Sequence, residues 1–364
     1  MKLPNNGKFF LTRYVPALSS GICLTLSFPG GDFPLIVFAA LVPLLISIQS
    51  MTAGQAFRAG LAAGFVHFVT LIYWIVPTLN QFGGLHPILA GLALTLLCVY
   101  LGLYPAWFAL GLAKGNFHPA LQPFMAACLW TGLEYIRTHA LTGFAWGVLG
   151  YSQHDSLLMI QIADITGVYG ISFLIVLVNA SLAGLWTAWK HKDPAGLIPA
   201  GTAVGLLAAV LAYGAYAVDR TEREIQSAET AKIGIVQGNI QQDVKWDANY
   251  KTRTLDRYIR LSLSLGPDAP DLVVWPETAL PFYYGFNRPL SDRVDQCIRQ
   301  MNTAFLIGSP AFERPDAESG TAIRFFNRAY LLNRFSIETG RYDKQHLVPF
   351  GEYVPFGRYL TFLG

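Results

Sequence analysis

The strongest constraint on this chain is that its charged residues are concentrated in the last part of the sequence. Residues 219–364 carry 18 Lys+Arg and 18 Asp+Glu, whereas residues 1–218 carry only 8 and 5. The hydrophobic fraction of 53% is therefore an average over two unlike parts. We predict two domains, an apolar domain of residues 1–218 and a polar domain of residues 219–364.

The apolar domain is predicted to cross a membrane several times. A helical crossing takes roughly 20 mainly apolar residues, and seven stretches reach or approach that length. They lie at about residues 14–28, 33–50, 56–78, 85–113, 119–137, 160–189 and 195–218. The first stretch is the weakest because it is short and contains Pro16, and the basic residues before it leave a cleaved signal peptide as an alternative. We expect about seven transmembrane helices.

The basic residues of the short loops predict how this domain is oriented. If the N-terminus lies in the cytoplasm, the outer short loops hold only Arg137. The inner side then holds seven basic residues, namely Lys2, Lys8, Arg13, Arg58, Lys114, Lys190 and Lys192. An odd number of crossings places the polar domain on the non-cytoplasmic face. This orientation inverts if the first stretch is not a span.

The polar domain shows the alternation of strands and helices that is typical of an α/β sheet. Buried-strand patterns occur at residues 232–239, 272–275 and 304–309, and helical spacing occurs at 246–265 and 290–302. Residues 327–332 and the segment around Tyr342 predict further, possibly paired, strands.

Several function classes find no support in the sequence. Four cysteines are too few and too scattered for a disulfide framework or a zinc site. Cys297 is expected to lie in a helix and to face the core of its domain. The seven histidines show no ligand spacing, there is no P-loop, GxSxG or HExxH motif, and no Lys/Arg cluster indicates nucleic-acid binding. A transporter is disfavoured because the spans hold few ionisable residues. Glu134 and Arg137 are expected to form a structural ion pair.

Glu277 stands out because it follows the apolar run 272–275 and Pro276. A carboxylate at the carboxyl end of a buried strand is well placed for acid–base chemistry. Burial beside Trp275 and Phe282 would tune its pKa for a general base. The alternative is that Glu277 caps the next turn.

Lys344 and Glu352 lie in a second dense segment, at residues 344–356. The Lys344 ammonium is a candidate for stabilising an oxyanion, and the alternative is a simple pair with Asp343. Glu352 lies in a loop that is too apolar for an ordinary surface turn.

The order and flanks of these residues resemble the apolipoprotein N-acyltransferases, membrane enzymes with a domain of the nitrilase (carbon–nitrogen hydrolase) superfamily. In the polar domain the matching segments are VQGNI (236–240), KW (245–246), VWPETA (274–279), YDK (342–344) and LVPFGEYVP (347–355). In the apolar domain they are TGFAW (142–146) and GVYG (167–170). Ala145 stands where the family usually has Pro.

The resemblance implies a multi-pass α-helical membrane domain followed by an α/β nitrilase-like domain, an αββα sandwich. It implies that Glu277 is the general base, Lys344 the oxyanion-stabilising lysine, Glu352 an accessory carboxylate and Trp246 a substrate-binding residue. The family's nucleophile is a cysteine on a later strand, and none of the four cysteines present takes its place. We therefore expect that the nitrilase-like domain is incomplete in these 364 residues, and that the segment alone is inactive.

The implied reaction is acyl transfer from a membrane phospholipid to the N-terminal diacylglyceryl-cysteine of an apolipoprotein, through a thioester acyl-enzyme. The resemblance implies neither a metal nor a diffusible cofactor. It does imply a multi-pass protein of the bacterial inner membrane, with the catalytic domain on the periplasmic side. Two alternatives remain open at this point. One is a membrane-anchored amidase, in which water attacks the thioester, and the other is an inactive lipoprotein-binding remnant.

Overall fold

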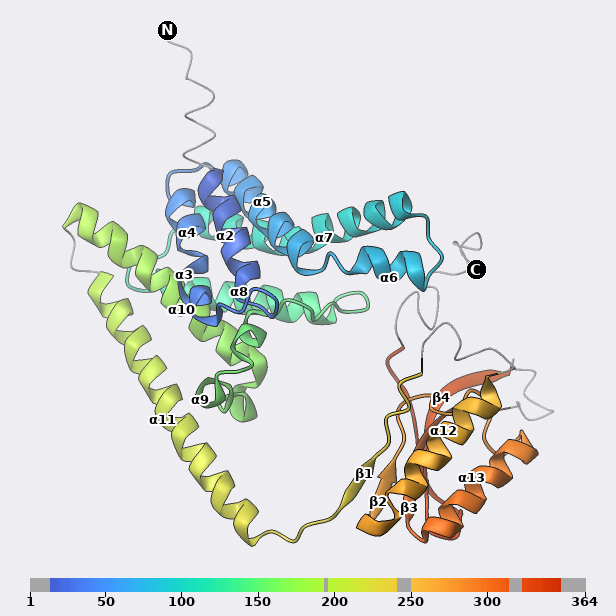
Figure 1. Ribbon diagram of the computed structural model, residues 1–364. Coiled ribbons are helices and arrows are strands. Elements are labelled where there is room, and N and C mark those ends of the chain that lie inside the picture. Colours follow the sequence, from blue (N-terminus) through green and yellow to red (C-terminus); the bar gives the residue numbers. More distant parts are fainter. Residues whose placement is uncertain (1–13, 193–195, 241–249, 314–322, 348–364) are drawn as a thin grey trace, which may run out of the picture. The chain divides into compact units, whose positions relative to one another are not determined.

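The computed structural model describes residues 14–192, 196–240, 250–313 and 323–347. The chain divides into two compact units, Met1–Ser227 and Ala228–Gly364, which we describe separately. The domain boundary expected at residue 218 falls within helix α11 (Leu197–Ser227), which continues to the end of the first unit (Figure 1).

The described residues of the first unit form helices and their connections. The α-helices are α2 (Val15–Leu26), α3 (Val37–Ala40), α4 (Val42–Ile48), α5 (Ala53–Leu71), α6 (Ile75–Gln81), α7 (Pro87–Lys114), α8 (Gln122–His139), α9 (Leu157–Ile160), α10 (Ala163–His191) and α11, and the 3₁₀ helices are η1 (Pro34–Ile36) and η2 (Leu149–Gln153). Each of the seven stretches predicted as a span contains helix.

Not every helix is long enough to cross a bilayer. Among the described residues, α7, α10 and α11 are long and apolar enough, and α5 with α6, bent by 50° at their junction, makes a fourth if the pair is one span. Helix α2 has only 12 residues, and α3 and α4 break the second predicted stretch into short pieces. Several of the described helices are therefore long and apolar enough to span a membrane, and the expected number of seven stays a prediction.

Backbone N–H and C=O groups at the breaks between the short helices are hydrogen-bonded by a buried side-chain amide on α10. Asn179 is fully buried; its Oδ1 accepts from Leu41 N (2.8 Å) and its Nδ2 donates to Val37 O (2.7 Å). Ser20 Oγ accepts from Leu44 N (3.0 Å). Irregular backbone in an apolar environment needs such protein partners because no water is present to replace them.

Helices α5 and α7 approach closely because their interface is lined by small residues. A Cβ added to Gly64 would lie 2.9 Å from the Gly102 Cα and 2.9 Å from the Pro105 Cγ. Small residues let helix backbones pack at short range where lipid gives no hydrophobic drive for association.

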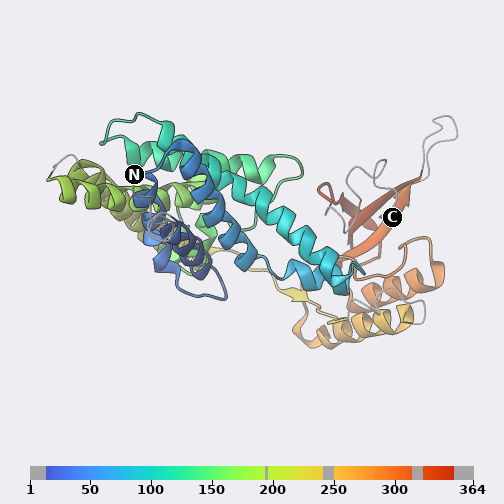
Figure 2. The ribbon, with the colours of Figure 1, turned by 90° about the horizontal axis from the view of Figure 1, so that it is seen from above.

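The second unit is a five-stranded sheet in the order β1-β2-β3-β4-β5. The strands β1 (Ile233–Ile235), β2 (Leu272–Val274) and β3 (Ala304–Glu313) are parallel, and β4 (Arg324–Leu332) and β5 (Glu338–Asp343) continue the sheet antiparallel. The crossovers contain α12 (Lys251–Ser264), the short η4 (Gly266–Asp268) and α13 (Arg288–Met301). Both views show α12 and α13 on the same face of the sheet (Figures 1 and 2). The predicted strands and helices are confirmed.

The core of this unit lies between the sheet and these two helices. Val273, Phe305 and Ile307 of the strands are fully buried, and they belong to the same cluster as Leu255 of α12 and Ile298 of α13. Cys297 is 2% exposed and faces this core, as predicted.

Replacing Gly64 by Ala should destabilise the first unit, because the new methyl group meets the α7 backbone. Overpacking of this kind costs about 1–3 kcal/mol, which thermal unfolding in detergent measures. The matched control is Gly91→Ala on α7, where an added Cβ meets nothing within 4 Å. Equal melting temperatures for the two variants would contradict the tight α5–α7 contact.

Candidate functional site

Glu277 lies in a turn that directly follows β2. Trp275 N donates to Leu306 O (2.8 Å) and Leu280 N donates to Gly308 O (3.1 Å), so both ends of the turn are hydrogen-bonded to β3. Thr278 has a positive φ of 52°, which lets the chain reverse immediately after the glutamate. The Glu277 backbone is therefore fixed on the edge of the sheet.

The glycine at position 308 of β3 makes this close approach possible. A Cβ at Gly308 would lie 2.6 Å from Thr278 N and 2.9 Å from the Glu277 Cα. Any side chain here would displace the turn that carries Glu277.

Lys344 follows β5 and reaches the same edge through the antiparallel pairing of β4 and β5. Its backbone N donates to Asn327 O (2.9 Å), which extends the β4–β5 ladder by one residue. Its Nζ lies 3.2 Å from Glu277 Oε1, although the two residues are 67 positions apart in sequence. The structure thus brings together the two residues that the sequence predicted as base and oxyanion lysine.

Asn327 is a third member of this cluster, and the sequence analysis did not find it. Its Nδ2 donates to Glu277 Oε1 (2.5 Å), and its Oδ1 accepts from Thr278 Oγ1 (3.4 Å). One Glu277 oxygen therefore accepts from both a lysine and an amide.

The Glu277 carboxylate is more exposed than expected. Its side chain is 62% exposed, and that of Lys344 is 29% exposed. Trp275 and Phe282 are themselves buried, at 2% and 4% exposure. The expectation that the Glu277 carboxylate is buried beside these two rings is wrong for the described residues. The turn at Thr278 directs the chain out of the core. The contacts at the carboxylate come from Lys344 and Asn327.

A buried arginine fixes the strand that carries Lys344. Arg328 is 5% exposed and binds both Asp343 oxygens, at 2.6 Å through Nε and 2.9 Å through Nη2. The same Nη2 donates to Glu313 Oε1 (2.8 Å). These hydrogen bonds hold the pKa of Asp343 and of Glu313 below the ordinary carboxyl value and raise the pKa of Arg328. Asp343 is thus engaged by Arg328, next to Lys344.

Cys297 does not have the surroundings of a nucleophile. Burial raises the pKa of its thiol to about 11, whereas a reactive cysteine needs a lowered pKa and access to substrate. The described residues also contain no group of three or more His, Cys, Asp or Glu side chains arranged to hold a metal. Trp246 and Glu352 lie outside the described residues, so their roles remain predictions.

Comparisons with known proteins match each of the two units to a protein family. Residues 20–181 match the family model "Apolipoprotein N-acyltransferase N-terminal domain", and residues 232–364 match "Carbon-nitrogen hydrolase". The fold is thus a helical membrane domain followed by a nitrilase-like domain, which confirms the predicted fold class.

Curated relatives define the family more narrowly. An apolipoprotein N-acyltransferase of Geobacter metallireducens is 38% identical over 364 residues, which are 100% of this chain and 69% of the relative. Those of Nitrosomonas europaea and Haemophilus ducreyi are 32% and 30% identical, over 96% and 93% of this chain and 66% and 64% of their own length. This chain belongs to the apolipoprotein N-acyltransferase family.

Replacing Asp343 by Asn should lower stability at neutral pH by roughly 1–2 kcal/mol, because a charged hydrogen-bonded pair with Arg328 is lost. The folded pKa of Asp343 lies below its unfolded value, so its contribution is full above about pH 4 and disappears as the pH falls through the folded pKa. The difference in the free energy of unfolding between wild type and variant should therefore become smaller in acid. Thermal unfolding as a function of pH measures it, with Asp292→Asn, on the exposed face of α13, as control. A gap that is constant with pH would contradict the assignment.

Proposed function

We propose that this chain supplies the general base and the oxyanion-stabilising lysine of an N-acyltransferase. The observation that carries the proposal is the 3.2 Å contact between Lys344 Nζ and Glu277 Oε1 in a domain of the carbon–nitrogen hydrolase family. The named activity of the curated relatives supports the same chemistry.

In the first half-reaction a cysteine thiolate attacks the ester carbonyl of a phospholipid. Glu277 takes the thiol proton, and the Lys344 ammonium stabilises the negative charge that develops on the carbonyl oxygen. The ester C–O bond then breaks, Glu277 gives its proton to the leaving oxygen, a lysophospholipid leaves and a thioester remains. Cys297 is not assigned as this nucleophile, because it is buried in the core of the domain.

In the second half-reaction the free α-amine of a diacylglyceryl-modified N-terminal cysteine attacks the thioester. An amide bond forms and the C–S bond breaks; Glu277 takes the proton that the amine loses and gives it to the sulfur, which regenerates the thiol. The same site serves both substrates in turn, which predicts ping-pong kinetics. In this scheme Trp246 contacts the substrate and Glu352 acts beside the lysine, as their positions in the family's motifs suggest.

We infer that the catalytic domain lies on the periplasmic side of the bacterial inner membrane. The support is the excess of basic residues in the loops assigned to the cytoplasm. A membrane-impermeant thiol reagent should label a cysteine introduced at the exposed position Asp292 in intact spheroplasts. Labelling only after permeabilisation would reverse the orientation.

Glu277→Gln and Lys344→Met in the full-length enzyme should each lower acyl transfer by at least about a hundredfold, because each removes a group that acts on the transition state. Mass spectrometry of a lipoprotein N-terminus measures the product. Glu338→Gln, a surface glutamate on β5 paired with Arg341, is the control and should retain activity. Turnover near wild type in either site variant would exclude that residue. Hydrolysis of a small amide without lipid dependence would favour the amidase alternative.

Replacing Asn327 by Ala should lower kcat roughly tenfold with little change in KM, since about 1.4 kcal/mol of positioning is lost when the Glu277 oxygen loses this donor. Asn327→Asp places a second carboxylate beside Glu277, and the repulsion between like charges disfavours the ionised form of the base. The acid limb of the pH–rate profile should therefore move to higher pH in Asn327→Asp only. A profile unchanged in both variants would limit Asn327 to a structural role.

A further inference from the structure

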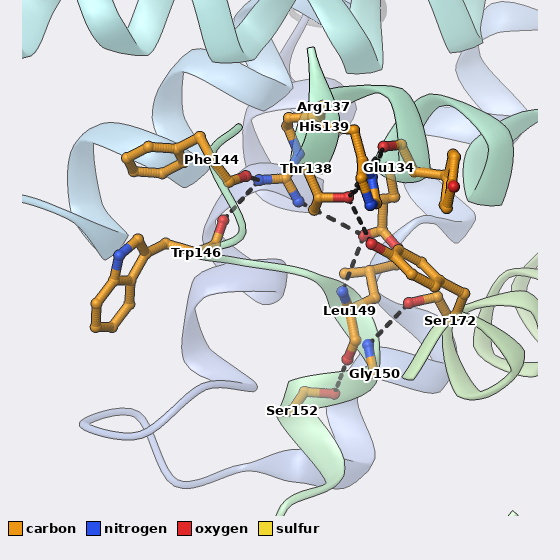
Figure 3. A network of polar contacts seen from close by, with 12 residues as sticks. Glu134, Arg137, Thr138, His139, Phe144, Trp146, Leu149, Gly150, Ser152 and Ser172 are labelled. Atoms are coloured by element: carbon orange, nitrogen blue, oxygen red, sulfur yellow. Dashed lines mark hydrogen bonds and ion pairs between the residues drawn. The ribbon is translucent and has the colours of Figure 1, made fainter. Parts of the chain in front are cut away.

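The last part of helix α8 carries a buried ion pair that holds a loop of the first unit (Figure 3). Glu134 and Arg137 are 4% and 2% exposed, and Arg137 Nη2 lies 4.0 Å from Glu134 Oε1, in accord with the predicted structural pair. Arg137 Nη1 donates to Phe144 O (2.9 Å) and Trp146 O (2.6 Å), and Glu134 Oε1 accepts from Leu149 N (2.9 Å). The pair thus fixes the loop 144–149 at both of its ends, and its charges are used within the protein.

A cavity of about 460 Å³ lies at the other end of α8. Its lining comes from the ends of α4, α7 and α10 and from the starts of α8 and α11. All the lining residues belong to the first unit, so the cavity is formed by the helical part alone. Its volume falls within the range of sites for small molecules, which is roughly 300–1,000 Å³.

The floor of this cavity is apolar. Leu45 of α4, Leu112 of α7 and Ala183 of α10 line it and are buried. Gly184 also lines it, and a Cβ added there would meet nothing within 4 Å, so a side chain has room to extend into the cavity from this position. Hydrocarbon suits such a floor, because the lining atoms then gain van der Waals contacts on their open side.

The mouth of the cavity is polar. Gln49, Thr187 and His191 line it, and the side chains of Gln49 and His191 are exposed. Thr187 Oγ1 donates to Gln49 Oε1 (3.0 Å), which ties α10 to the end of α4. The Gln49 amide and the His191 imidazole both carry N–H donors, and Lys190 and Lys192 flank His191 in sequence. Donors and ammonium groups together suit an anion.

The charge at these helix ends is positive. Arg58 lies in the first turns of α5, Lys114 ends α7, and Lys190 lies in the last turn of α10, followed by Lys192. The described acidic residues of the first unit do not line the cavity; they are Asp32, Glu134, Asp155, Asp164, Asp219, Glu222 and Glu224. Asp193 lies outside the described residues. The charges around the mouth therefore favour a negatively charged ligand.

We propose that this cavity binds one anionic phospholipid of the surrounding bilayer. An acyl chain lies against the apolar floor, and the phosphate lies at the mouth beside His191 and the lysines. The apolar floor selects a lipid over free phosphate, which would leave that surface uncovered, and the positive charge selects an anionic head group over a zwitterionic one. Basic pockets between transmembrane helices bind anionic lipid head groups in this way.

The bound lipid would join five helices that contribute to one cavity. It is a structural ligand of the helical unit, separate from the phospholipid that donates the acyl group. The inference rests on the first unit alone and stands independently of the acyl-transfer proposal.

Native mass spectrometry of the full-length protein in detergent tests the site with a diether phosphatidylglycerol, whose ether-linked chains cannot serve as acyl donors. Gly184→Leu places a side chain in the cavity and should lower the number of tightly held lipids by one. Gly205→Leu, at an exposed glycine of α11 where an added Cβ meets nothing within 4 Å, is the matched control and should hold as many lipids as wild type. Lipid held elsewhere is common to all three proteins and cancels. Equal lipid counts for wild type and Gly184→Leu would overturn the proposal.

A pair of charge variants tests the mouth without filling the cavity. Lys190→Gln combined with Lys192→Gln should weaken phosphatidylglycerol binding on the order of thirtyfold, since each basic residue near a membrane surface attracts an anionic lipid. Binding of phosphatidylcholine with the same chains should not change. Arg220→Gln combined with Arg223→Gln removes the same charge from the far part of α11, where both arginines are paired with carboxylates, and should leave both affinities unchanged.

Two results of this titration would contradict an anionic lipid site. Wild-type binding of phosphatidylcholine as tight as that of phosphatidylglycerol would show that the head-group charge is not recognised. Displacement of the lipid by inorganic phosphate alone would assign the mouth to a free anion.

Discussion

The pairing of β4 with a strand on each side is the contact on which the candidate site depends. Strand β4 pairs with β3, against which the Glu277 turn is hydrogen-bonded, and with β5, after which Lys344 follows. The site thus forms only if both registers are correct. A slip of one residue reverses the face to which each side chain points, and the Lys344 ammonium would leave Glu277. The Arg328–Asp343 pair lies one register position from the site and specifies the register through two charged hydrogen bonds.

The first unit obeys a different constraint, because its apolar surroundings provide no hydrogen-bonding partners. Its backbone is nevertheless irregular at the junctions of α3 and α4 and in the loop before η2. Buried side chains meet the needs of these segments. Asn179 binds the backbone at both ends of α3, and Glu134 with Arg137 binds the loop 144–149. Polar residues inside this unit are therefore explained by the breaks in its helices.

Local patterns predicted the elements of the second unit well because each pattern is set by neighbouring residues. The apolar run at 272–275 became β2, and the helical spacing at 290–302 became α13. Glu277 and Lys344 were identified from their motifs. Asn327 was missed because an asparagine within a strand pattern carries no sign of the partner opposite it; only the sheet places it beside Glu277. The exposure of Glu277 was missed for a related reason, since the positive φ of Thr278 is not evident from residue type.

The sequence by itself determined that this chain has an apolar helical part and a polar α/β part, because hydrophobic periodicity and charge density act locally along the chain. It also determined which ionisable residues follow the strands. The tertiary structure decided which of them meet. The contact between Glu277 and Lys344, the donor from Asn327 and the cavity shared by α4, α7 and α10 all join segments that are distant in sequence. Such contacts depend on strand register and helix packing, which are fixed by the cooperative burial of many side chains.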